Sequence, residues 1–94
     1  MKKITIVGLG NMGLNFINSV NKDFKKNISD IEINSLLLIP KELDKDFIIN
    51  NIQKNHQIFV VAGLGGSTSN ALIELVDILK IIDINPNVIV LLLP

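Results

Sequence analysis

Residues 4–13 read Ile-Thr-Ile-Val-Gly-Leu-Gly-Asn-Met-Gly, and residues 58–70 read Ile-Phe-Val-Val-Ala-Gly-Leu-Gly-Gly-Ser-Thr-Ser-Asn. In each stretch an apolar, β-branched run leads into a glycine-rich loop, and the two loops together contain all six glycines of the chain. A helically spaced segment follows each loop. A strand, a glycine turn and a helix N-terminus form an anion-binding unit, because backbone N–H groups and the helix dipole both favour negative charge. Two such units in a small domain indicate a nucleotide whose phosphates are held from both sides.

Apolar runs alternate with segments of helical spacing, which predicts one α/β domain over residues 1–94. The runs lack polar alternation, as expected for a parallel sheet with helices on both faces, so we expect a Rossmann-like sheet of about four strands. The expected strands are residues 4–7, 31–33 (with an alternative extension to 39), 58–62 and 88–93. The expected helices run from Asn11 or Asn15 to about residue 24, within 41–55, and onward from Ser69 or Asn70.

The last apolar run, residues 88–93, contains no polar side chain. As a strand it needs cover on both faces, and only the helix after Asn70 is expected to supply any. We therefore expect that helix to bury one face. Because the other face would lack cover, we also expect the chain to self-associate or to depend on a partner.

The composition argues against several classes of function. Nine basic and nine acidic residues give a formal net charge of zero, which leaves no electrostatic footprint for nucleic acid or for an anionic membrane. The chain contains no cysteine, hence no disulfide and no thiolate ligand or nucleophile. Its longest apolar run is far shorter than the roughly 20 residues needed to cross a bilayer. We expect a soluble, cytoplasmic domain that does not insert into membranes.

The first loop matches the dinucleotide fingerprint Gly-x-Gly-x-x-Gly, with its glycines at positions 8, 10 and 13 between a strand and a helix. The fingerprint requires an acid at the end of the second strand to hold a ribose hydroxyl. Asn34 and Ser35 stand near that position, and Glu32 falls too early. An NAD(P)-binding Rossmann fragment of an oxidoreductase is therefore one hypothesis. A tight turn without a ligand is the structural alternative.

The second loop is more specific, because a plain Rossmann domain has no need of Gly-Gly-Ser-Thr-Ser-Asn after its later strand. Residues 60–71 resemble the signature loop of the tubulin/FtsZ family of GTPases, whose core is Gly-Gly-Gly-Thr-Gly-Ser/Thr-Gly. Residues 6–15 resemble the family's first loop, a glycine run followed by an asparagine that maps onto Asn15. Residues 33–35 resemble the Val-Asn-Thr at the end of the family's second strand, and residues 88–90 with Pro94 resemble its closing strand.

The resemblance implies a truncated FtsZ-like GTP-binding domain, an incomplete tubulin/FtsZ GTPase domain over residues 1–94. It implies GTP or GDP as the ligand, with Mg²⁺ held through the phosphates, and a role in bacterial-type cell division. In the family, the asparagine that maps onto Asn15 lies at the guanine nucleotide. The candidate binding residues are Gly8, Gly10, Asn11, Met12, Gly13, Leu14, Asn15, Asn34, Gly65, Gly66, Ser67, Thr68, Ser69 and Asn70.

The chain departs from the family in ways that bear on catalysis. Met12 and Leu14 bring bulk where the family mostly has glycine, and neither glycine loop contains an Asp or Glu. The acidic loop that one family subunit supplies to its neighbour has no counterpart in this sequence. We therefore predict no catalytic residue, no protein metal ligand, and no GTP turnover above a buffer control.

The implied partners are guanine nucleotide and either a second copy or a full-length FtsZ-like protein. A degenerate interaction module, which joins such a relative's filament without binding nucleotide, is a third hypothesis. His56 is the only histidine and has no cysteine or acid cluster beside it. We expect it to be a solvated turn residue.

Overall fold

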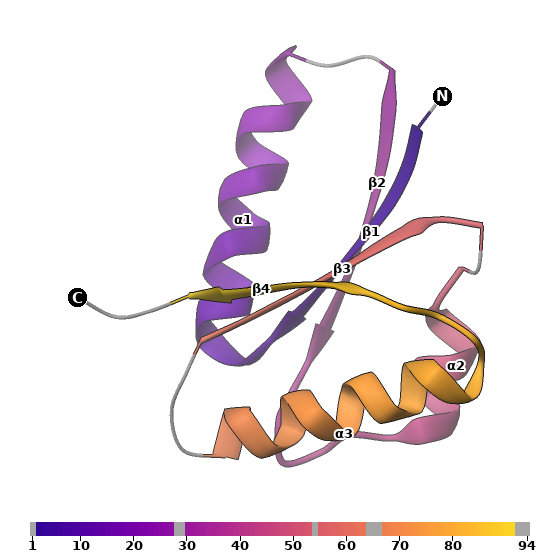
Figure 1. The fold of residues 1–94 in the computed structure, drawn as a ribbon. Coiled ribbons are helices and arrows are strands. Elements are labelled where there is room, and N and C mark those ends of the chain that lie inside the picture. The colour runs from indigo at the N-terminus through magenta and orange to yellow at the C-terminus, as the bar shows by residue number, and fades with distance from the viewer. Residues whose placement is uncertain (1, 28–29, 54, 64–66, 92–94) are drawn as a thin grey trace.

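The computed structural model describes residues 2–27, 30–53, 55–63 and 67–91. Strands and helices alternate along the chain as β1 (Lys2–Leu9), α1 (Gly10–Asn27), β2 (Ile31–Leu38), α2 (Lys45–Asn51), β3 (Gln57–Gly63), α3 (Ser67–Ile81) and β4 (Asn87–Leu91). The strands form one four-stranded sheet in the order β2-β1-β3-β4, and every neighbouring pair is parallel (Figure 1). This confirms the α/β fold with a parallel sheet.

The helices lie on both faces of the sheet, with α1 on one side and α2 and α3 on the other (Figure 1). Successive residues of a strand point to opposite faces, so Ile6 packs toward α1 while Val7 packs toward α2 and α3. The larger core cluster lies on the α2 and α3 side and includes Val7, Leu9, Val60, Leu75 and Leu79, all fully buried. This two-sided burial explains why the strands read as unbroken apolar runs.

β2 is a single strand, and the longer of the two expected versions is close to what the structure shows. It continues through Asn34 and Ser35 because every residue of it pairs with β1, from Ile31 opposite Lys2 to Leu38 opposite Leu9. Its carboxyl end therefore lies level with the first glycine loop. The helix expected within residues 41–55 is shorter than that window, and Asp44 caps it by accepting hydrogen bonds from the backbone N–H groups of Asp46 and Phe47 at 3.0 and 3.2 Å.

We expected α3 to bury one face of the last strand, β4, and this expectation is wrong. Val88 lies opposite Val60 on that face, and Val88 and Val90 are 43% and 41% exposed. The reason is the position of α3, which packs mainly against β3 and α2 and leaves the edge of the sheet open. The intervening residues, Ile89 and Leu91, instead pack against the core cluster on the α1 side.

The expectation that His56 is solvated is also wrong, since only 6% of the residue is exposed. Its Nδ1 lies 3.1 Å from Thr5 Oγ1 and 3.4 Å from Asn34 Nδ2, in the amino-terminal half of the sheet. The Asn34 amide nitrogen donates, so it and the Thr5 hydroxyl suit Nδ1 as an acceptor, while Nε2 faces Glu32 Oε2 at 3.8 Å. The buried imidazole keeps hydrogen-bond partners, because Thr5 of β1 and Asn34 of β2 supply them.

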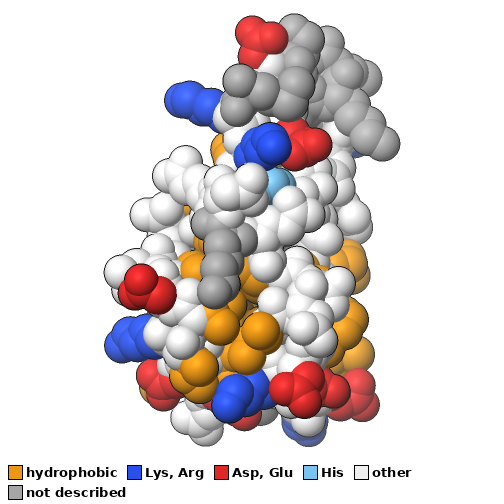
Figure 2. Space-filling model, turned by 90° about the vertical axis from the view of Figure 1, so that its right-hand side faces the viewer, with side chains coloured by type: hydrophobic (Ala, Val, Ile, Leu, Met, Phe, Trp, Pro, Cys, Tyr) orange, Lys and Arg blue, Asp and Glu red, His pale blue; other side chains and the backbone are white. Residues whose placement is uncertain are grey.

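Among the described residues, no helix has both the length and the hydrophobicity that a bilayer crossing requires. Acidic and basic side chains are mixed along the lower rim of the face shown in Figure 2. That face therefore carries no large single-sign field in this region.

Candidate functional site

The strand order places the carboxyl ends of β1 and β3, which the two glycine loops follow in the sequence, at the point where the direction of winding reverses. From β1 the chain moves outward to β2, and then returns past β1 to β3 on the other side. In open parallel sheets, ligands bind outside the carboxyl ends of the strands at such a point. The two loops follow β1 and β3, which are neighbours, with Leu9 opposite Ala62 near their carboxyl ends.

Gly10 lies where three segments meet. Its φ of +77° falls in the left-handed region, which glycine adopts without the strain that a side chain would bring. A Cβ built on Gly10 would lie 3.6 Å from Pro40 Cγ and 3.6 Å from Thr68 Oγ1. The start of α1, the segment after β2 and the first turn of α3 therefore come together around this one backbone position.

Gly8 and Gly13 allow the first turn of α1 to lie directly on the sheet. A Cβ on Gly13 would be 2.8 Å from Gly8 Cα and 2.8 Å from the Val61 carbonyl oxygen, both backbone atoms that cannot move aside. Close helix–strand packing is the role that the third glycine has in the dinucleotide fingerprint, whereas the positive φ of the turn falls at Gly10, its second glycine. The spacing of the fingerprint is therefore joined by its packing geometry at Gly13.

The remaining candidates of the first loop lie on the first turns of α1. Asn11 and Asn15 are exposed, and Met12 and Leu14 are half-buried. The Met12 side chain packs on Gly63, with its sulfur at the place where a Cβ of Gly63 would be. Met12 therefore fills the space between the ends of β1 and β3 on the α1 side.

The candidates of the second loop are described only in part. Gly65 and Gly66 lie outside the described residues. Ser67 begins α3, and Thr68, Ser69 and Asn70 follow in its first turn, with Thr68 and Ser69 half-buried and Asn70 exposed. The structure brings Thr68 next to the first loop, with its Oγ1 3.6 Å from the Cβ position of Gly10.

Asn34 is not brought to the glycine loops. It lies opposite Thr5 in the middle of β2, four positions before the strand ends at Leu38. Its amide hydrogen-bonds His56, which directly precedes β3 and therefore lies at the end of that strand away from the glycine loops. The carboxyl end of β2 instead carries Leu37, Leu38 and Ile39, so no carboxylate stands where a dinucleotide domain holds the ribose hydroxyl.

A cavity of about 330 Å³ lies beside Gly10, between α1 and the carboxyl end of β2. We call it the edge slot; it is lined by Gly10, Asn11, Leu14, Leu37, Leu38, Ile39 and Pro40. Sequence reasoning found three of these residues and missed those at the end of β2. Pro40 was the available signal, because a strand extended to residue 39 places its carboxyl end here.

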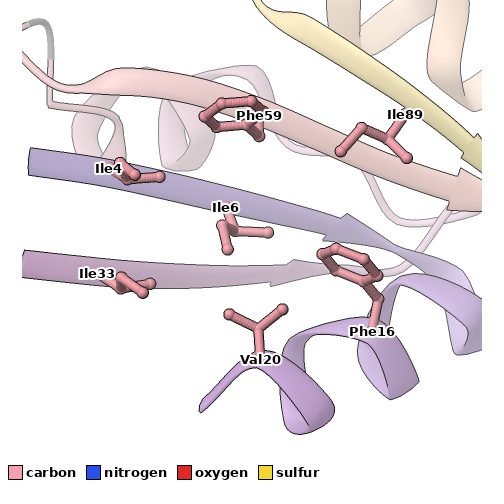
Figure 3. A pocket seen from close by; sticks show the side chains of 7 residues that line it. All are labelled: Ile4, Ile6, Phe16, Val20, Ile33, Phe59 and Ile89. Atoms are coloured by element: carbon pink, nitrogen blue, oxygen red, sulfur yellow. The ribbon is translucent and has the colours of Figure 1, made fainter. Parts of the chain in front are cut away.

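A second, smaller hollow of about 190 Å³ lies between α1 and the sheet (Figure 3). The close view shows only aliphatic and aromatic side chains around it, from all four strands and from α1: Ile4, Ile6, Phe16, Val20, Ile33, Phe59 and Ile89. Ligand sites need a few polar groups to fix orientation, and this hollow has none. The edge slot, with backbone and amide groups at its rim, is the better candidate.

Within the described ranges, no group of three or more His, Asp or Glu side chains is placed to hold a metal ion. A cation at the glycine loops would therefore depend on oxygens that the ligand brings. Comparison with protein-family models, with curated proteins and with solved structures found no significant match to this chain.

Proposed function

We propose that the chain is an FtsZ-like nucleotide-binding protein whose ligand is GTP or GDP. The observation that carries the proposal is the convergence at Gly10, where the start of α1 and Thr68 of α3 meet at the carboxyl ends of two neighbouring parallel strands. Two helix N-termini then face one small volume, which suits a polyanion better than any neutral ligand.

The roles of the groups follow from their positions. Backbone N–H groups at the first turns of α1 and α3 would bind phosphate oxygens, and the Thr68 hydroxyl would donate one further hydrogen bond. Mg²⁺ would be held through the phosphates. The choice of guanine rests on the sequence resemblance of residues 6–15 and 60–71 to the tubulin/FtsZ loops.

Binding without turnover is the proposed activity of the isolated chain. Neither glycine loop contains an Asp or Glu, so neither offers a general base to a water molecule at the terminal phosphate. In the proposed setting of bacterial cell division, a full-length FtsZ-like partner would supply that acid. GTP hydrolysis by the purified chain should match a buffer control, and phosphate release that Thr68→Ala abolishes would contradict this.

Thermal unfolding with millimolar GTP, GDP, ATP, NADH and NADPH tests the choice of ligand. A ligand that binds only the folded state raises its stability by about 2.7 kcal/mol at a concentration of 100 Kd. We expect guanine nucleotides to raise the melting temperature and nicotinamide cofactors to leave it unchanged. A shift with NADH or NADPH alone would reverse this ranking.

One observation favours NAD(P) as a second candidate. Gly13 packs on the Gly8 backbone as the third glycine of the dinucleotide fingerprint does, and Gly10 takes a positive φ between β1 and α1. Against it, the end of β2 carries only apolar side chains where that fold holds a ribose. The melting series separates the two candidates directly.

The open edge of the sheet supports the proposed association with a second copy or an FtsZ-like partner. β4 exposes Val88 and Val90, and no charged residue interrupts the strand from Asn87 to Leu91. Uncharged edge strands are templates for pairing with another chain. Light scattering should therefore detect species larger than a monomer, reduced by Val88→Lys or Val90→Lys. A monodisperse monomer would refute the association, and an association without any nucleotide binding would favour the interaction-module hypothesis.

A further inference from the structure

β4 is an edge strand whose free side carries no charge. Within the residues that the structure describes, β4 pairs with β3 alone, so its other side keeps unpaired backbone N–H and C=O groups. Natural sheets protect such an edge with charged side chains or a proline, and the run Asn-Val-Ile-Val-Leu at residues 87–91 has neither. The free side of β4 is therefore able to accept another strand.

The opposite edge of the sheet, β2, is less suited to pairing with a second copy. β2 carries Glu32, whose side chain is 48% exposed, and the polar residues Asn34 and Ser35 lie in the middle of the strand. An exposed carboxylate on an edge strand opposes pairing, because the charge must give up water as the new strand approaches. The two edges thus differ, and β4 is the one open to association.

The side chains of β4 are arranged almost symmetrically about Ile89. Val88 and Val90 flank it and point to the face of α3, where they remain 43% and 41% exposed, while Ile89 points to the face of α1. In an antiparallel pair with a two-fold axis at Ile89, each Val88 lies opposite Val90 of the other copy, and the two Ile89 side chains lie opposite each other. Cross-strand pairs of β-branched residues stabilise antiparallel strands. The strand is therefore complementary to itself.

We propose that two copies of this chain join through their β4 strands, antiparallel and related by a two-fold axis at Ile89. Two four-stranded sheets then form one continuous sheet. This inference rests on the association proposed above and names its partner as a second copy. Because the same strand is used by both copies, no β4 edge stays free, and the association stops at the dimer.

Pairing adds cover to both faces of β4. On the face of α3, the exposed Val88 and Val90 of one copy contact those of the other. On the face of α1, Ile89 lines the hollow beside Phe59 (Figure 3), so Ile89 of the second copy adds apolar surface at its rim. Both contacts remove apolar surface from water. With only five residues in each strand the interface is smaller than the standard size of roughly 1,600 Å², so we expect a Kd of about 10 μM.

The two-fold axis also fixes where the candidate nucleotide sites lie in the dimer. It reverses the direction of the strands, so the carboxyl ends of the two sheets point to opposite ends of the joined sheet. The glycine loops follow these carboxyl ends in the sequence. Neither copy therefore completes the nucleotide site of the other, and dimerisation should not require nucleotide.

Single cysteines report the pairing directly, because the chain has no cysteine of its own. Opposite residues of an antiparallel pair have Cα atoms about 4.5–5.5 Å apart, within the disulfide range of about 4.4–6.8 Å, so Ile89→Cys should cross-link to itself on mild oxidation. Val88→Cys alone is offset diagonally by about 7–8 Å and should form at most about a tenth as much disulfide. Mixed with Val90→Cys, it should cross-link readily. Ile73→Cys, at a position 63% exposed on α3, controls for random collisions.

Analytical ultracentrifugation without nucleotide measures the size of the assembly. The unmodified chain should follow a monomer–dimer equilibrium, and Val90→Lys should weaken dimerisation at least about tenfold. Ile73→Lys, which adds the same charge at an exposed position on α3, should leave the dimer unchanged. Circular dichroism verifies that each variant remains folded.

Three results would overturn the proposed dimer. The first is an Ile89→Cys chain that cross-links no better than Ile73→Cys, and the second is a Val88→Cys chain that cross-links to itself as readily as Ile89→Cys. The third is an unmodified chain that stays monomeric at about 100 μM, ten times the expected Kd, or that assembles beyond the dimer. If GTP binds to such a chain, the proposed ligand stands and the dimer fails. A dimer that binds no GTP refutes the proposed ligand alone.

Discussion

In the amino-terminal half of the sheet, the buried Thr5 and His56 and the partly buried Asn34 form a hydrogen-bonded network, whereas at the carboxyl end Gly10 leaves backbone partly exposed. Both regions concentrate polar groups on the same strands. In the first, the partners come from within the chain, so the network stabilises the fold and offers nothing to a ligand. In the second, the N-termini of α1 and α3 leave N–H donors for an outside partner.

The largest expected effect comes from the close packing at the carboxyl end. Gly13→Ala places a Cβ 2.8 Å from Gly8 Cα and from the Val61 oxygen, so we expect a loss of about 3 kcal/mol in the free energy of unfolding. Gly63→Ala is the matched control. Its Cβ meets the Met12 sulfur, which can move aside, and Met12 Cβ at 3.2 Å, which must shift by a few tenths of an ångström, so we expect a smaller loss of about 1 kcal/mol. Urea unfolding measures both, and equal losses would show that α1 does not rest on rigid backbone.

Thr68→Ala tests whether the carboxyl end serves a ligand and not the fold. Loss of a hydroxyl that donates to a charged phosphate should weaken GTP binding by about 2 kcal/mol. Thr68→Ser retains the hydroxyl and should bind GTP nearly as well as the unmodified chain. The free energy of unfolding should change by less than about 0.5 kcal/mol in both. If Thr68→Ala lowers stability by as much as it lowers affinity, the two regions do not differ as described.

Thr5→Val makes the converse test in the amino-terminal half. Valine keeps the shape but removes the 3.1 Å contact to His56 Nδ1, so the free energy of unfolding should fall by about 1 kcal/mol. The affinity for GTP should not change. Thr5→Ser keeps the hydroxyl and should recover most of the bond. Chemical unfolding and calorimetry distinguish these outcomes, and a change in GTP affinity would link two regions that we treat as separate.

The smallest expected effect is at the rim of the same network. Glu32 Oε2 lies 3.8 Å from His56 Nε2, but the glutamate side chain is about half exposed at 48%. Glu32→Gln should therefore change the free energy of unfolding by less than about 0.5 kcal/mol. A loss larger than that of Thr5→Val would show that the exposed contact of Glu32 with His56 stabilises the fold more than the buried hydrogen bond between Thr5 and His56 does.

The sequence predicted the parts of this molecule that depend on local patterns. The glycine spacing after an apolar run predicted the turn at Gly10 and the start of α1 nearby, and the apolar runs predicted a parallel sheet with helices on both faces. These features follow from backbone geometry and strand burial, which neighbouring residues determine.

What the sequence did not reveal depends on residues far apart in the chain. Asn34 and Ser35 interrupt an apolar run, and only the later arrival of His56 makes Asn34 compatible with the interior of β2. Without that contact one of the two expected versions of β2 ended too early, at residue 33, and the edge slot was missed. The exposure of Val88 likewise depends on where α3 packs, which no local pattern specifies.

The central position of β1 also has a consequence for how the protein is made. β1 leaves the ribosome before the other three strands of the sheet, yet one of its two neighbours is β3, which begins only at Gln57. Parallel pairings of this kind close long loops before they gain contacts, so they form slowly. Until β3 and α3 have emerged, Val7 and Leu9 lack most of the core that buries them. The nascent chain therefore presents an uncovered apolar strand until β3 and α3 have emerged, and this is the interval in which chaperones would bind it.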